Sequence, residues 1–125
     1  MLYAGYLWLI VGFALDGLAG LGLVPPFPAL HALTTGAIGV FTLGMMARVT
    51  LGHTGREMRS ARLTNLAFAV INLAAFTRVL LPLAMPATYT IWLNTSGLLW
   101  TLAFALFLWI YAPMLIAPRV DGRPG

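Results

Sequence analysis

The sequence predicts an all-α integral membrane protein: four transmembrane helices in an up-down bundle, with both termini in the cytoplasm. Of the 125 residues, 61% are hydrophobic and only 8% are charged, and the mean hydropathy is +0.93. Soluble domains are about half apolar and about a quarter charged. The apolar residues also fall into four runs of about 20 residues, the length of helix that crosses about 30 Å of hydrocarbon.

We expect the four spans at about 2–23, 29–51, 61–83 and 88–112, within a single four-helix membrane domain over residues 1–125. The first run lacks the early basic residue of a signal peptide, so we expect it to be a retained helix. Pro, Gly and charged residues separate the spans, in VPPFPAL, GHTGREMRS and LPLAMPA. Because these connections are short, neighbouring helices are expected to run antiparallel.

Charge sets the expected orientation. Arg56, Arg59 and Arg62 surround the second connection, and Arg119 and Arg123 lie in the tail, whereas the first and third connections carry no charge. The positive-inside rule therefore places the second connection, the tail at 113–125 and both termini in the cytoplasm. No long basic face lies outside the expected spans, so no nucleic-acid partner is expected.

The sequence lacks the residues that several classes of chemistry require. The chain has no cysteine, which excludes disulfides, iron–sulfur clusters, c-type haem attachment and cysteine-rich zinc sites. It has no HExxH motif, phosphate loop or paired carboxylates, so hydrolysis and phosphoryl transfer are not supported. Whether the protein is an enzyme stays open.

Small residues favour close helix packing in lipid, and glycines recur through the first two spans. They include Gly5, Gly12, Gly20, Gly36, Gly39 and Gly44. In the third span, Asn65 and Asn72 lie seven residues apart on one helical face and suit hydrogen bonding between helices. We therefore expect the first two helices to pack closely and the third to bond its neighbours through asparagine.

The polar residues of the expected outer half form a first candidate site. Asp16, His31, Thr35 and Arg78 all fall there, with Thr34 and Asn94. Charges at this depth are costly unless they are paired or hydrated, so Asp16 and Arg78 either form an ion pair or serve a function, with Arg78 binding the carboxylates of a ligand. His31 is either a haem or metal ligand or an interfacial histidine bonded to a carbonyl.

The two histidines cannot share one site. The 22 residues from His31 to His53 span about 33 Å of helix, so one metal ion or haem cannot bridge them. His53 lies with Arg48 and Arg56 in a basic cluster at the other end. On a helical wheel a half-polar stripe starts at His31, and we expect it to face inward or toward a partner. It contains His31, Thr35, Ile38, Thr42, Met45 and Val49.

Two stretches resemble a known family. HALTTGAIGVFTLGMMARVTLGHTGR, residues 31–56, and the ending YAPMLIAPRVDGRPG resemble the C-terminal part of the NnrS family, whose members are longer bacterial membrane proteins with more spans. The resemblance implies haem b, less directly copper, a link to nitric oxide metabolism and denitrification, and the bacterial inner membrane. It implies His31 as the first candidate metal ligand, His53 as the second, and Arg78 as a partner of haem propionates.

Three functions follow as hypotheses. The first is an NnrS-like haem-binding component of nitric oxide or respiratory metabolism. The second is a cofactor-free accessory subunit of a larger respiratory membrane complex, with other subunits or further copies as partners in the lipid bilayer. The third is a small transport or quinone-binding module in which Asp16, His31 and Arg78 handle protons or a polar head group.

Overall fold

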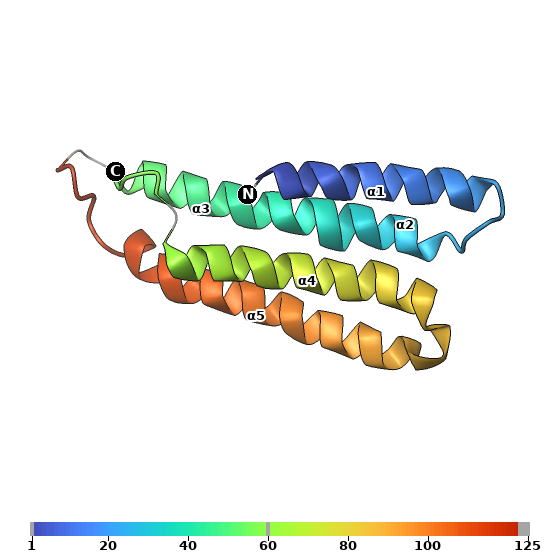
Figure 1. Ribbon diagram of the computed structural model, residues 1–125. Helices are drawn as coiled ribbons and strands as arrows, with labels where there is room; N and C mark the ends of the chain where they lie inside the picture. Colours follow the sequence, from blue (N-terminus) through green and yellow to red (C-terminus); the bar gives the residue numbers. More distant parts are fainter. Residues whose placement is uncertain (1, 60, 123–125) are drawn as a thin grey trace.

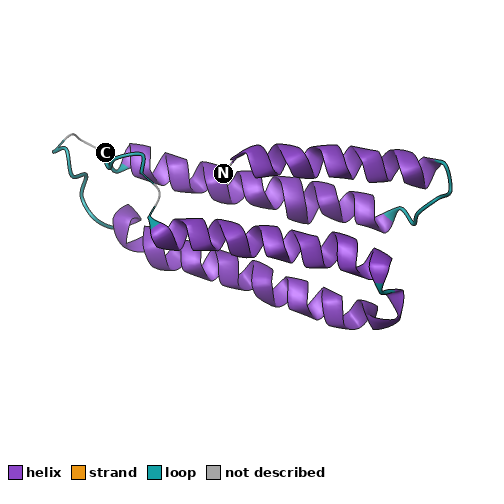
Figure 2. Cartoon of the chain, viewed as in Figure 1, coloured by secondary structure: helices purple, strands orange, loops and turns teal. Residues whose placement is uncertain are grey.

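Four long helical stretches run up and down through the part of the chain that the structure describes (Figure 1). The structure is a computed structural model that describes residues 2–59 and 61–122. The elements, in chain order, are α1 (Leu2–Gly20), α2 (Phe27–His31), η1 (Ala32–Ile38), α3 (Gly39–His53), α4 (Arg62–Ala84), η2 (Pro86–Thr88) and α5 (Tyr89–Leu115). Figure 2 shows only helices and loops over the described residues.

All four stretches are long and apolar enough to cross a membrane. The second, Phe27–His53, is one continuous rod made of α2, η1 and α3. The predicted fold class is confirmed, and each helix end lies within about one turn of the expected boundary. The start of α1 and the end of α5 lie toward the same end of the bundle (Figure 1). Their cytoplasmic location stays a prediction.

Two helices are central and two are peripheral. The α2–α3 rod and α4 pack against each other, while α1 packs on the rod and α5 packs chiefly on α4. In each of the two central spans, 44% of the apolar stretch is buried inside the chain. The buried share is 22% in α1 and 17% in the span that contains α5. The peripheral helices therefore present most of their surface to lipid or to another protein.

Glycines bring α1 against the rod. A Cβ added at Gly36 would lie 2.7 Å from the Trp8 ring, and one at Gly5 would lie 2.7 Å from Phe41. The expectation of close packing is confirmed for these positions because a side chain there has no room. It is wrong for Gly20, where an added Cβ meets nothing within 4 Å.

One asparagine links the peripheral and central helices. The Trp8 indole N–H donates to Asn72 Oδ1 at 3.0 Å, and the Asn72 amide donates to the Phe68 carbonyl at 2.7 Å. Asn65 instead is exposed and makes no hydrogen bond through its side chain within residues 2–59 and 61–122. The expected asparagine bonding is confirmed for Asn72 and wrong for Asn65.

The segment η1 is a seven-residue π-helix that begins directly after His31. Its hydrogen bonds reach five residues instead of four, so the wider turn shifts the faces of the helix that follows. The faces of this span were predicted from the sequence as those of a uniform α-helix. Long π-segments are rare and are found mostly at functional sites.

Candidate functional site

His31 and Arg78 lie close together at the end of the bundle that carries the connections after α1 and after α4. His31 is the last residue of α2, and Arg78 comes from α4, which packs against α2. The two side chains are half-buried and near enough to interact electrostatically. Neither makes a side-chain hydrogen bond or ion pair within the described residues. The structure therefore brings His31 and Arg78 within electrostatic range of each other, and neither side chain has an acidic partner among the described residues.

The alternative in which Asp16 pairs with Arg78 is wrong. Asp16 is exposed on α1, and no salt bridge joins it to Arg78 in the described part of the chain. The preceding residue, Leu15, packs with Ala29 of α2 and Val79 of α4, whereas Asp16 itself stays exposed. Asp16 as part of a cofactor site stays a prediction without a contact to support it.

Thr35 lies inside the π-helix, one turn beyond His31, and is half-buried. Farther along the stripe, Ile38 is 60% exposed, Met45 50% and Val49 48%. Ile38, Met45 and Val49 therefore do not face the interior of this chain, and the alternative, in which this part of the stripe faces a partner, stays a prediction. Ile38 lies inside the π-helix, and the wider turn rotates the residues that follow it relative to a uniform helical wheel.

At the opposite end, His53 borders a surface groove of about 410 Å³. Met45, Arg48 and Val49 come from one face of α3, Met58 from the following loop and Arg119 from the tail. An imidazole and two thioethers suit Cu(I). Two guanidinium groups in the same groove oppose a metal cation, however, and favour an anionic group. The donor set here thus does not fit a bare copper ion.

The tail folds back onto the loop that follows α3. The Arg119 guanidinium forms an ion pair with Asp121, with Nη2 to Oδ2 at 2.6 Å, and donates to the His53 carbonyl at 3.0 Å. The Val120 backbone N–H donates to the Thr54 carbonyl at 3.2 Å. A cation beside the last carbonyls of a helix is favourable, so Arg119 also caps α3.

Gly55 makes this docking geometrically possible. Its φ of +72° ends α3 in a Schellman motif, in which the Arg56 N–H bonds the Leu51 carbonyl at 2.9 Å. A Cβ at Gly55 would lie 2.8 Å from Asp121 Cγ. The hydrogen bonds that Arg119 donates to Asp121 also raise the pKa of the Arg119 guanidinium above its usual value.

The sequence analysis missed the docking of residues 119–121 on residues 53–55. The glycine after His-Thr was a local signal for a helix end, but nothing local indicates which distant segment packs on it. The π-helix was not predicted from the sequence either.

No group of three or more His, Asp or Glu side chains able to hold a metal ion occurs among the described residues. A haem needs only one or two protein ligands, so this finding concerns metal ions held by three or more side chains and does not concern haem.

Comparison with known proteins gives one positive result. No curated protein and no solved structure matches the chain. The family model described as "NnrS protein" matches residues 1–119, most of the chain, and this range includes residues 53–55. The four membrane-crossing helices agree with a multi-pass membrane protein. The chain belongs to the NnrS family.

Proposed function

We propose that this NnrS-family membrane protein binds haem b in the bacterial inner membrane, with His31 as the axial ligand, and serves in nitric oxide or respiratory metabolism. The supporting observation is the pair of unneutralised basic groups, His31 and Arg78, on adjacent central helices. A half-buried imidazole supplies the nitrogen that haem iron takes, and a guanidinium suits a propionate.

The chain's own residues set the ligation number. His53 lies at the far end of the α2–α3 rod, so it cannot reach the same iron as His31. One protomer then offers one histidine, and a haem with a single protein ligand keeps a position open for a diatomic gas. Thr35, half-buried one turn away in the π-helix, carries a hydroxyl on the stripe that starts at His31.

An optical spectrum tests the proposal. Protein made under haem-replete conditions is expected to show a Soret band that shifts with dithionite and, in the reduced protein, with nitric oxide. His31→Ala should lose the band, and His53→Ala, which removes the other histidine, should keep it. Arg78→Gln should weaken haem retention. Absence of the band in the unaltered protein, or its survival in a helical and monodisperse His31→Ala variant, would refute the proposal.

A second function, a cofactor-free accessory subunit of a respiratory complex, has its own supporting observation. Asp16 on α1 and Asn94 on α5 are exposed within membrane-crossing helices. Polar groups in such helices are costly in lipid and usually meet a partner. Crosslinking in native membranes should then yield a larger species, and Asp16→Leu should weaken it. A chain that stays monomeric in membranes and mild detergent contradicts this function.

A further inference from the structure

One cavity lies at the end of the bundle opposite His31, away from the proposed haem site. It measures about 630 Å³ and opens between the start of α1, the last turns of α3 and the start of α4. Leu2, Leu51 and Phe68 provide apolar walls. On its floor, the buried hydroxyls of Thr64 and Tyr111 bond each other at 3.0 Å. The interior therefore suits a hydrocarbon chain better than a polar solute.

Among the described residues, Arg48 is the only one with a charged side chain that lines the cavity. It is exposed, and it makes no hydrogen bond or ion pair within the described residues. It also lines the neighbouring groove beside His53 and Arg119. The rim thus carries an unpaired cation next to an apolar interior, which matches a molecule with an anionic head and a hydrocarbon tail.

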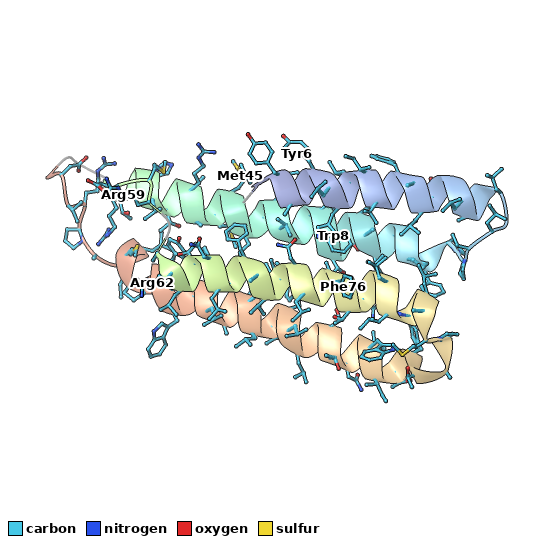
Figure 3. The ribbon with its side chains drawn as sticks, viewed as in Figure 1. Tyr6, Trp8, Met45, Arg59, Arg62 and Phe76 are labelled. Atoms are coloured by element: carbon cyan, nitrogen blue, oxygen red, sulfur yellow. The ribbon has the colours of Figure 1, made fainter. Side chains whose placement is uncertain are left out.

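Two tyrosines place the mouth at the level of lipid head groups. Tyr3 and Tyr6 line the cavity from the first turns of α1, and they are 83% and 57% exposed. Tyr6 projects from the outer side of α1 in Figure 3, and its ring packs edge-on against Phe41 at 5.0 Å. Exposed tyrosines near the end of a membrane-crossing helix lie at the membrane interface. Figure 3 also shows Arg59 and Arg62 at this end of the bundle.

We propose that this cavity is a binding site for one anionic phospholipid, with the phosphate at Arg48 and an acyl chain between Leu2, Leu51 and Phe68. Charge complementarity selects the head group, because Arg48 lacks an acidic partner. The apolar walls select a lipid over a water-soluble phosphate. The site does not depend on haem, so either proposal can fail alone.

Native mass spectrometry of the full chain in detergent, titrated with phosphatidylglycerol or with phosphatidylcholine of the same chains, tests the site. One lipid is expected to bind, with the anionic head preferred. Arg48→Gln should weaken phosphatidylglycerol binding about fivefold, the effect of one arginine at an anionic surface. Arg59→Gln is the matched control, since it removes the same charge from an exposed loop residue that pairs with Glu57, and should leave the affinity unchanged.

Three results would overturn the proposal. Equal binding of the two lipids would mean that the cavity takes any chain without regard to charge. Equal loss in both arginine variants would assign the effect to diffuse surface charge. Competition by millimolar inorganic phosphate would point to a soluble anion. Thermal stabilisation of the unaltered protein by phosphatidylglycerol over phosphatidylcholine is an independent readout that requires no variant and is expected to show the same preference.

Discussion

Gly36 is the position where one methyl group should disturb the contact between α1 and the α2–α3 rod most clearly. An added Cβ would lie 2.7 Å from Trp8 Cγ and 3.0 Å from Trp8 Cβ. Rotation of the indole cannot relieve the second contact, because the α1 backbone fixes the position of that Cβ. Trp8 must therefore move, and we expect this movement to break the 3.0 Å hydrogen bond from its indole N–H to Asn72.

Gly36→Ala is expected to destabilise the protein relative to Gly17→Ala, where the added methyl meets nothing within 4 Å. Overpacking costs about 1–3 kcal/mol, and an interhelical hydrogen bond in a membrane is worth about 0.6 kcal/mol. Both variants gain a similar helix propensity, which cancels in the comparison. The expected gap in the free energy of unfolding is about 1.6–3.6 kcal/mol.

Reversible unfolding in mixed micelles, followed by circular dichroism, measures this gap. Asn72→Leu should destabilise the unaltered protein but have a smaller effect in the Gly36→Ala background, because the same hydrogen bond is already broken. Equal stabilities of Gly36→Ala and Gly17→Ala would refute the packing argument. Full additivity with Asn72→Leu would refute the coupling through Trp8.

Three further predictions concern hydrogen bonds. Asn72→Leu should lower the free energy of unfolding by about 0.6 kcal/mol, and Asn65→Leu, an exposed residue of the same helix, by much less; equal losses would contradict the assigned bonds. Tyr111→Phe and Thr64→Val should each destabilise the protein, and a double-mutant cycle should give a coupling energy of about 1 kcal/mol. A coupling energy of zero would contradict the hydrogen bond between the two hydroxyls. Arg119→Gln should expose the tail to limited proteolysis. The unaltered tail should stay protected from about pH 6 to about pH 10: the hydrogen bonds that Arg119 donates to the neighbouring carboxylate raise the Arg119 pKa, so the docking that depends on its charge is lost only above the usual range of arginine.

The composition and the positions of the prolines, glycines and arginines determined the fold class. Four helices had to form because a chain in lipid satisfies its backbone hydrogen bonds internally, and the apolar runs fix their length. Glycines at positions 5 and 36 indicated the close packing of α1 on the rod, and the family resemblance rested on motifs that the structure brings together at residues 53–55 and 119–121.

Only the tertiary structure decided which polar residues meet. A helical wheel shows one face of one helix, so it could not show that Arg78 lies beside His31 while Asp16 points outward. The π-helix after His31 changed the faces of everything that follows, which periodicity based on 3.6 residues per turn cannot anticipate. The contact of the tail with Gly55 joins segments more than sixty residues apart. Such contacts depend on how the helices pack together, and no local pattern of residues encodes them.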